Sequence, residues 1–145
     1  MNIIECLEER GLIDALTTPD LKKIAENPLK AYIGFDPTAD SLHLGSLMGI
    51  VILKWFQKYG HTPVIVLGGA TGGIGDPSGK SSERVLLDSS VIEYNIKKIR
   101  THFEQVLDFF HPTARPLVFN NMDWMGRCSF VDFLRDVGKH FRVNN

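Results

Sequence analysis

The chain has 145 residues, 43% of them hydrophobic and 23% charged, and a formal net charge of −1. This length and apolar content suit a single domain with a buried core. The near-neutral charge argues against a dedicated nucleic-acid surface, because neutralising phosphate groups requires clustered Lys and Arg. The sequence has no apolar run that could cross a bilayer and no leader-like start, so we expect a cytoplasmic protein that does not bind membranes.

The two cysteines, Cys6 and Cys128, lie far apart and have no metal-ligating neighbours in the sequence. We therefore expect two free thiols in a reducing compartment, and no metal site built by the protein itself.

Helical and extended patterns alternate along the chain. Apolar residues at helical spacing predict helices, and short β-branched or aromatic runs predict strands. In chain order we expect a short helix near 3–13 broken at Gly11, a helix over 21–26, a strand over 30–35, a helix over 42–59, a strand over 63–67, a helix from 88 or 89 to 107, a strand over 116–119 and a helix over 130–137. This alternation predicts a parallel sheet with helices on both faces, and three strands correspond to the front half of a doubly wound α/β domain.

Ligands of open parallel sheets bind beyond the C-terminal ends of the strands. In this chain those ends lead into residues 34–46, 68–84 and 120–124, which are also the parts richest in Gly, Asp and Asn. Two independent observations therefore point to the same rim of the sheet.

The segment 34–46 has the chemistry of a nucleotide site. A helix capped by Asp40 or Ser41 would direct its free N–H groups and positive dipole end at an anion. Thr38 and His43 add hydrogen-bond donors there, and Gly45 would let an adenine or ribose approach the backbone. Taken alone, His43 is better explained as a capping or core histidine; the combination with the Asp-Pro-Thr loop favours binding.

The segment 68–84 contains two misleading glycine patterns. Residues 75–81 imitate a phosphate-binding P-loop but have one residue too few between the glycines. Residues 69–75 match the glycine spacing of short-chain dehydrogenases, but the following residues form a poor helix.

Three charged residues of the same segment have two interpretations each. Asp76 either caps a turn or receives a substrate ammonium group. Lys80 and Arg84 are either solvated charges or cations that close over a polyphosphate.

Tyr32 lies within the first strand, where a tyrosine usually belongs to the core. A pocket for a phenol would also need such a hydroxyl as donor and acceptor. Asn121 and Trp124 follow the third strand and would line the same cavity, or else form a turn and part of the core.

Four stretches, taken together, resemble bacterial tyrosyl-tRNA synthetases. Each glycine-rich piece is weak evidence alone, but all four occur in the family's order and span nearly the whole chain. The matching stretches are YIGFDPTADSLHLG at 32–45, GGATGGIGDPSGK with SER at 68–84, NNMDW at 120–124 and FLRDVGKHF at 133–141.

The resemblance implies that residues 1–145 are the N-terminal portion of a class I synthetase catalytic domain, with a Rossmann-like fold. It implies activation of L-tyrosine by ATP, assisted by Mg²⁺, and transfer of the tyrosyl group to tRNA(Tyr). Tyrosine would be bound by Tyr32, Gly34, Asp36, Asp76, Asn121 and Trp124. ATP would be bound by Pro37, Thr38, Ala39, Asp40, Ser41, Leu42, His43, Leu44, Gly45 and Ser46. The catalytic groups would be Thr38, His43, Lys80 and Arg84, acting by positioning and charge.

The chain departs from the family pattern in several places. Ser46 replaces the second histidine of the His-x-Gly-His element, Gly49 replaces a common threonine, and Ile33 stands where some relatives have cysteine. The later family motifs and the tRNA-binding region would lie beyond Asn145. We therefore expect that this chain alone forms no adenylate at a useful rate, and that a homodimer belongs to the full-length enzyme.

Two alternatives remain open. One is an NAD-binding reductase of the short-chain type, using Gly69, Gly73 and Gly75. It would also require a Tyr-xxx-Lys catalytic pair, which we do not expect the tyrosines of this chain to supply. The other is a non-catalytic remnant that only binds a partner.

Overall fold

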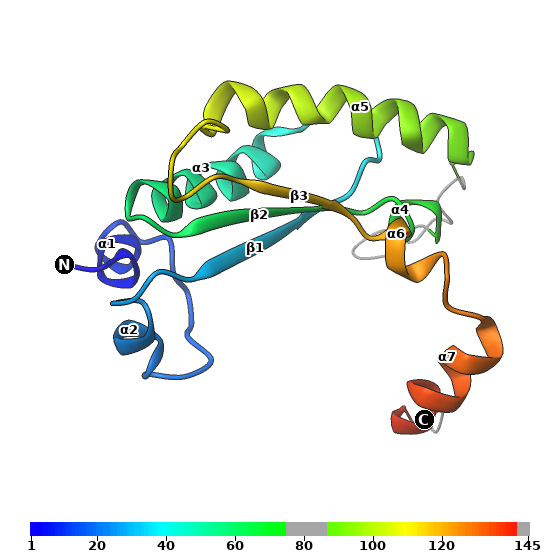
Figure 1. The fold of residues 1–145 in the computed structure, drawn as a ribbon, viewed down its shortest axis with the longest axis horizontal. Coiled ribbons are helices and arrows are strands. Elements are labelled where there is room, and N and C mark those ends of the chain that lie inside the picture. The colour runs from blue at the N-terminus through cyan, green and yellow to red at the C-terminus, as the bar shows by residue number, and fades with distance from the viewer. Residues whose placement is uncertain (75–86, 142–145) are drawn as a thin grey trace.

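The computed structural model describes residues 1–74 and 87–141. Helices and strands alternate through most of this part of the chain (Figure 1). The elements are α1 (Ile3–Glu9), α2 (Leu21–Ile24), β1 (Lys30–Phe35), α3 (Leu44–Lys58), β2 (Thr62–Leu67), α4 (Thr71–Ile74), α5 (Ser89–Val106), β3 (Leu117–Asn120), α6 (Met122–Met125), α7 (Phe130–Asp136) and the 3-10 turn η1 (Gly138–His140).

The three strands form one parallel sheet in the order β1-β2-β3. Tyr32 pairs with Val64, and Val64 pairs with Leu117, so these side chains share one face of the sheet. The parallel sheet predicted from the alternating pattern is confirmed, and its strand boundaries differ from the expected ones by one residue at most.

The two long helices, α3 and α5, lie on the same side of the sheet (Figure 1). Phe35 and Ile65 point toward them and pack with Leu53 of α3 and with Ile99 and Phe103 of α5. Four of these five side chains have no exposed surface, and full burial of such a side chain contributes about 1.5–3 kcal/mol.

Helices were expected on both faces, but in residues 1–74 and 87–141 the two long helices cover only one. The reason lies in the strand order. Successive strands are added in one direction, and right-handed crossovers then place both connecting helices on one side. A doubly wound sheet covers its other face only where the direction of strand addition reverses.

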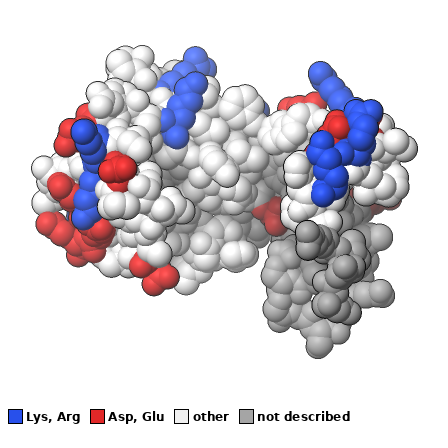
Figure 2. All heavy atoms as spheres, turned by 90° about the horizontal axis from the view of Figure 1, so that it is seen from below, with Lys and Arg blue, Asp and Glu red and all other residues white. Residues whose placement is uncertain are grey.

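The opposite face of the sheet carries Tyr32, Gly34 and Phe119. Tyr32 is 75% exposed and Phe119 is 46% exposed. From that side, Lys, Arg, Asp and Glu gather toward two ends of the molecule, and the described surface between them is mostly uncharged (Figure 2). An apolar, uncharged sheet face is suited to contact with a ligand or with further polypeptide.

The first two helices lie near the N-terminal ends of the strands, away from the rim (Figure 1). Asn2 and Glu5 form a reciprocal capping box at the start of α1. Ile3 and Leu7 of this helix pack against the C-terminal half of α3, where Arg10 lies 4.0 Å from the ring centroid of Trp55. These contacts anchor α3 at the end remote from the rim.

Candidate functional site

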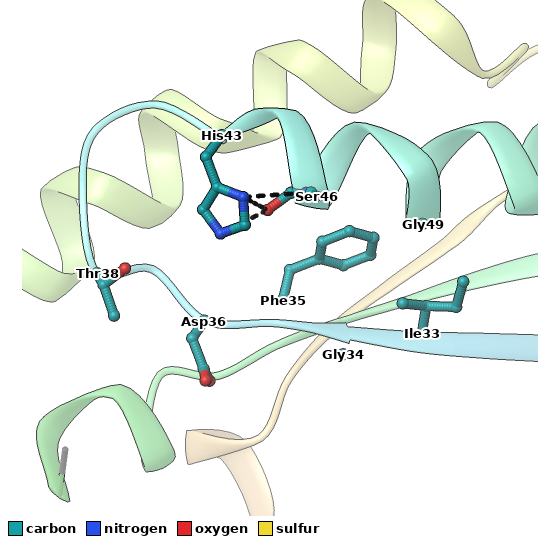
Figure 3. A pocket seen from close by; sticks show the side chains of 9 residues that line it. Ile33, Gly34, Phe35, Asp36, Thr38, His43, Ser46 and Gly49 are labelled. Carbon is teal, nitrogen blue, oxygen red and sulfur yellow. Dashed lines mark hydrogen bonds between the residues drawn. The ribbon is translucent and has the colours of Figure 1, made fainter. Parts of the chain in front are cut away.

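An open pocket of about 340 Å³ lies between the C-terminal end of β1 and the first turns of α3 (Figure 3). Its lining comes from two sequence segments that the fold places face to face. The lining residues are Ile33, Gly34, Phe35, Asp36, Thr38, His43, Gly45, Ser46 and Gly49. Six of these nine residues were assigned to the site from the sequence, so the structure brings that group together.

Helix α3 begins at Leu44, and His43 is its N-cap. The ring Nδ1 of His43 accepts a hydrogen bond of 3.2 Å from the backbone N–H of Ser46. The expected caps, Asp40 and Ser41, are therefore wrong. Leu42, the residue before the N-cap, packs against the main core cluster.

The cap has a chemical consequence for the His43 ring. Because Nδ1 accepts the Ser46 N–H, the neutral ring carries its proton on Nε2. The Ser46 hydroxyl lies 3.4 Å from this Nε2, so both groups stand at the N-terminus of a 15-residue helix, where the free N–H groups and the dipole already favour anions.

Gly45 has a structural role beside the one expected from the sequence. A Cβ atom at this position would lie 3.0 Å from both Cε1 and Nδ1 of His43. A side chain at position 45 would crowd the exposed His43 ring where it lies over the start of the helix, and glycine avoids this contact. The same missing side chain leaves the backbone of the first turn open to the pocket.

A chain of hydrogen bonds joins the ends of all three strands. The Thr71 hydroxyl donates to Oδ1 of Asp36 at 3.2 Å, and Nδ2 of Asn121 donates to the Thr71 hydroxyl at 3.1 Å. Oδ1 of Asn121 in turn accepts from the backbone N–H of Ala70 at 2.7 Å. Asp36 follows β1, Ala70 and Thr71 follow β2, and Asn121 follows β3. We call these linked groups the strand-end clamp.

The first two glycines after β2 allow the clamp to close. A Cβ atom at Gly68 would collide with the Asp36 carboxylate and the Thr71 hydroxyl, and one at Gly69 would collide with the Asn120 side chain. This close approach explains the Gly-Gly pair without a bound phosphate.

Three of the expected tyrosine-pocket residues lie outside the pocket beside α3. Asn121 is only 7% exposed and its amide is engaged in the clamp. Trp124 is 50% exposed on α6. Tyr32 lies on the uncovered sheet face, two residues before Gly34 on the same strand, and its side chain is therefore directed to the side away from α3.

The remaining residues of the expected ATP segment separate into three groups. Pro37 is buried, and its carbonyl accepts a 3.0 Å hydrogen bond from Nδ2 of Asn95. Ala39 and Asp40 are exposed. The other three residues, Ser41, Leu42 and Leu44, line a second pocket of about 350 Å³ beside α5.

Asn95 holds the loop after β1 through the Pro37 carbonyl, and this contact was not predicted from the sequence. It is buried in α5, in line with Ile92 and Ile99 on the apolar side of the helix. An Asn within an apolar helical stripe needs a hydrogen-bond partner when buried, and this was the available signal.

A sequence model of the family described as tRNA synthetases class I (W and Y) matches residues 23–145. The chain belongs to this family. It is 54% identical over 143 residues to the tyrosine–tRNA ligase of Protochlamydia amoebophila, and 48% identical over 145 residues to that of Pectobacterium atrosepticum. In both cases the alignment covers 99% of this chain and 34% of the relative. The chain thus spans about a third of the length of the curated relatives it matches.

Solved structures of the same family share the fold. A C-terminally truncated mitochondrial tyrosyl-tRNA synthetase from Aspergillus nidulans superposes with a TM-score of 0.83 at 28% identity, over 99% of this chain and 44% of that one. The corresponding protein from Coccidioides posadasii gives 0.77 at 29% identity, over 99% and 41%. The resemblance to tyrosyl-tRNA synthetases is confirmed, as is the Rossmann-like first half of a class I catalytic domain.

Asp76, Lys80 and Arg84 of this synthetase chain lie outside the described residues. Within residues 1–74 and 87–141, no group of three or more His, Cys, Asp or Glu side chains could hold a metal ion. Over the same ranges, none of the helices has the length and apolar character that a bilayer span requires.

One expectation about the reductase alternative was wrong, namely that no tyrosine has a lysine four residues later. Tyr94 and Lys98 do stand at Tyr-xxx-Lys spacing, contrary to expectation. Both lie on α5, where the Lys98 ammonium is 5.5 Å from the centroid of the half-exposed Tyr94 ring. Gly69 and Gly73 line a pocket of about 160 Å³ whose described lining contains neither Tyr94 nor Lys98. The geometry therefore does not combine the glycines with this pair.

Proposed function

We propose that this chain forms the ATP- and tyrosine-binding part of a tyrosine–tRNA ligase. The observation that carries the proposal is the rim itself: Thr38, His43 and Gly45 surround one pocket whose lining also includes Gly34, and Gly34 lies on the same sheet face as Tyr32. A triphosphate and an aromatic amino acid held on the two sides of Gly34 would meet at the end of β1.

In this proposal the phosphates of ATP lie at the N-terminus of α3. The Thr38 hydroxyl and the Nε2–H of His43 donate to the terminal phosphate, where the helix dipole adds further positive potential. Residues 37–43 and the first turn of α3 surround the nucleotide, and Ser46 supplies a hydroxyl beside Gly45. Lys80 and Arg84 are proposed to bring further positive charge.

The substrate tyrosine is proposed to lie along the uncovered face of β1. The Tyr32 hydroxyl would hydrogen-bond the substrate phenol, and Asp76 would hold its ammonium group. A Cβ atom at Gly34 would meet nothing within 4 Å, so the backbone there leaves room for the reacting carboxylate. Asn121 would act by positioning Asp36 through Thr71, and Trp124 would add an apolar wall.

The proposed chemistry needs no proton transfer to or from the protein. A carboxylate oxygen of tyrosine attacks the α-phosphorus of ATP and forms the mixed anhydride tyrosyl-adenylate. The bond from that phosphorus to the bridging oxygen breaks, and pyrophosphate leaves with the electron pair. The protein contributes alignment and positive potential for the charge that develops.

Mg²⁺ enters this proposal as part of the substrate, bound to the phosphates of ATP. The described residues do not fit a resident metal site, since they contain no group of three possible ligands. We assign no step to a protein-bound metal.

Other parts of the function belong to the whole enzyme. Transfer to tRNA(Tyr), homodimer formation and a cytoplasmic location are proposed on the similarity to tyrosine–tRNA ligases alone. The location varies among relatives, because one from Arabidopsis thaliana is described as chloroplastic/mitochondrial. The tyrosine-bearing face is uncovered in the described residues, so we also propose that this chain alone forms no adenylate at a useful rate.

The proposal is tested by ligand binding to the 145-residue chain. We expect the unfolding temperature to rise with ATP and with tyrosine but not with NAD, because ligands that bind the native state stabilise it. The Tyr32→Phe variant should bind tyrosine about tenfold more weakly, through one lost hydrogen bond. Tyr94→Phe, on the outer surface of α5, is the matched control and should bind tyrosine normally.

Each competing result has a distinct meaning. A response to NAD alone would replace the proposal with a nucleotide-dependent reductase, and no response to any of the three ligands would favour a non-catalytic remnant. Tyrosine-dependent exchange of ATP with pyrophosphate measures the chemistry directly, and rapid exchange by the isolated chain would contradict the expected inactivity.

A further inference from the structure

The loop after β1 is anchored at Pro37 before it reaches the pocket. Pro37 is fully buried, whereas residues 38–41, which follow it, are exposed and belong to no helix or strand. Thr38 is the first of these exposed residues and lines the pocket beside α3 (Figure 3). The place of Thr38 in the pocket therefore depends on how firmly the residue before it is held.

Two helices contact Pro37. On α4, a Cβ atom at Gly72 would lie 3.2 Å from Cδ and 3.3 Å from Cγ of the Pro37 ring, so the backbone of this helix is packed against the ring. On α5, Nδ2 of Asn95 donates a hydrogen bond of 3.0 Å to the Pro37 carbonyl. Packing restrains the place of the ring, and the hydrogen bond, because it is directional, sets the orientation of the carbonyl.

The Pro37 carbonyl belongs to the same peptide group as the Thr38 N–H. Because this group is planar and trans, fixing the carbonyl also fixes the direction of the N–H and the place of the Thr38 Cα atom. The bond from Asn95 is thus passed to Thr38 by covalent geometry alone. Asn95 is not among the described residues that line the pocket.

The residue type at position 95 is not explained by helix packing. Asn95 is 4% exposed and stands in line with Ile92 and Ile99 on the buried side of α5. An apolar residue would extend that stripe without a polar group to satisfy, and asparagine is a poorer helix former than leucine. The bond to the loop is what the amide provides and an apolar side chain would not.

We propose that Asn95 is a positioning residue for the terminal phosphate of ATP and acts through Pro37 and Thr38. It orients the peptide group before Thr38, so that the Thr38 hydroxyl stays directed at the phosphate. A loop that is already restrained loses less conformational freedom when a ligand binds. Asn95 itself contacts neither the substrates nor the reacting atoms, and the inference rests on the proposed function.

Residues that act through one another give non-additive effects in a double-mutant cycle. The four proteins to compare are the 145-residue chain and its Asn95→Ser, Thr38→Val and doubly substituted variants. The serine hydroxyl lies nearer to the backbone than the asparagine amide and loses the bond to Pro37, and Thr38→Val removes the hydroxyl but keeps the shape. Dissociation constants for ATP and for AMP are measured by titration of the backbone amide resonances.

The expected pattern is specific to an action through Thr38. Each single variant should weaken ATP binding by about tenfold, because each loses the equivalent of one hydrogen bond. The double variant should stay within about twofold of Thr38→Val, because Asn95 has no further effect once the hydroxyl that it positions is absent. AMP lacks the terminal phosphate, so its dissociation constant should stay within about twofold in all four proteins.

Gln57→Leu is the matched control for a general loss of structure. Gln57 is also a buried amide, and its Nε2 donates to the carbonyls of Asp108 and Ala114 at 2.8 Å and 3.0 Å. It lies near the C-terminal end of α3 and is not among the described lining residues of the pocket. This variant should lower the unfolding temperature, because buried carbonyls lose their partner, yet leave the affinity for ATP within about twofold.

The outcomes distinguish the inference from the proposed function. If the wild-type chain binds ATP and the double variant loses affinity by the product of the two single effects, the positioning role is refuted while the ATP site stands. An equal loss of ATP affinity in Gln57→Leu, or an equal loss of AMP and ATP affinity in Asn95→Ser, would refute it as well. Should the serine variant unfold, Asn95→Leu, which has a similar size and no donor, takes its place in the cycle. If the wild-type chain does not bind ATP, the proposed function itself is refuted.

Discussion

The Thr71 hydroxyl donates a hydrogen bond of 3.2 Å to the Asp36 carboxylate, although the two residues lie 35 positions apart. Thr71 also accepts from Asn121, so one hydroxyl connects the ends of all three strands. The strand-end clamp fixes the carboxylate of Asp36 at the edge of the pocket. Precise placement of this carboxylate is what its proposed role beside the substrate tyrosine requires.

Removing the hydroxyl of Thr71 should weaken the clamp. In Thr71→Val, Asp36 and Asn121 both lose a partner, and the free energy of unfolding should fall by about 1–2 kcal/mol. Thr71→Ser keeps the hydroxyl and should lie within about 0.5 kcal/mol of the wild-type chain. Urea unfolding measures both. The control is Thr101→Val on α5, whose exposed hydroxyl bonds the Lys98 carbonyl; an equal loss there would mean that the clamp has no special role.

A side chain at Gly68 should disrupt the same junction from the backbone side. Gly68→Ala would place its Cβ atom against the Asp36 carboxylate and the Thr71 hydroxyl, and we expect a loss of more than about 2 kcal/mol in unfolding free energy. Gly73→Ala, on the adjacent short helix α4, meets only Cδ1 of Ile92, at 3.4 Å. The free energies of unfolding of the two variants, measured by chemical denaturation, should therefore differ clearly. Equal values would contradict the collision at Gly68.

His43 should show separable capping and binding roles. His43→Ala removes the acceptor for the Ser46 N–H and should cost about 1 kcal/mol of unfolding free energy. His43→Asn supplies another good N-cap and should keep the stability of the wild-type chain. Both variants lack the imidazole Nε2–H, so both should bind ATP more weakly. Titration with ATP beside urea unfolding checks this; wild-type affinity in His43→Asn would leave the ring with a capping role alone.

His61 should make the fold sensitive to acid. It is buried, its Nδ1 accepts from the Leu29 N–H at 3.2 Å, and burial lowers its pKa from the ordinary value of 6.5. The unfolded chain therefore binds a proton at a higher pH than the folded chain does. The stabilisation is fully present above pH 6.5 and is lost as the pH falls toward the folded-state pKa.

Thermal unfolding between pH 8 and about 5 tests this dependence. His61→Asn removes the titrating group, so the unfolding temperature should fall less as the pH is lowered. His140→Asn, at an exposed position, keeps His61 and should retain the decline seen in the wild-type chain. A decline that is identical in all three proteins would assign the acid sensitivity to other groups.

Much of the architecture was predictable from local pattern. The β-branched run at 62–67 and the apolar spacing of 89–106 indicate a strand and a helix whatever their surroundings, because periodicity reflects burial on one side. The start of α5 was expected at Asp88 or Ser89, and the structure has Asp88 as the N-cap. The start of α3 was not predictable, since Asp40, Ser41 and His43 can all accept a hydrogen bond from a helix N–H. In the folded chain the His43 ring is the group that accepts the Ser46 N–H.

The chain by itself determined its elements, its family and the rim where ligands belong, because those depend on residue type, spacing and order. Only the tertiary structure decided that the Asn121 amide is bonded within the strand-end clamp and that Gly68 makes room for the Asp36 carboxylate. Each of these depends on side chains from distant segments meeting within a few ångströms, and such meetings are created by strand pairing and helix packing.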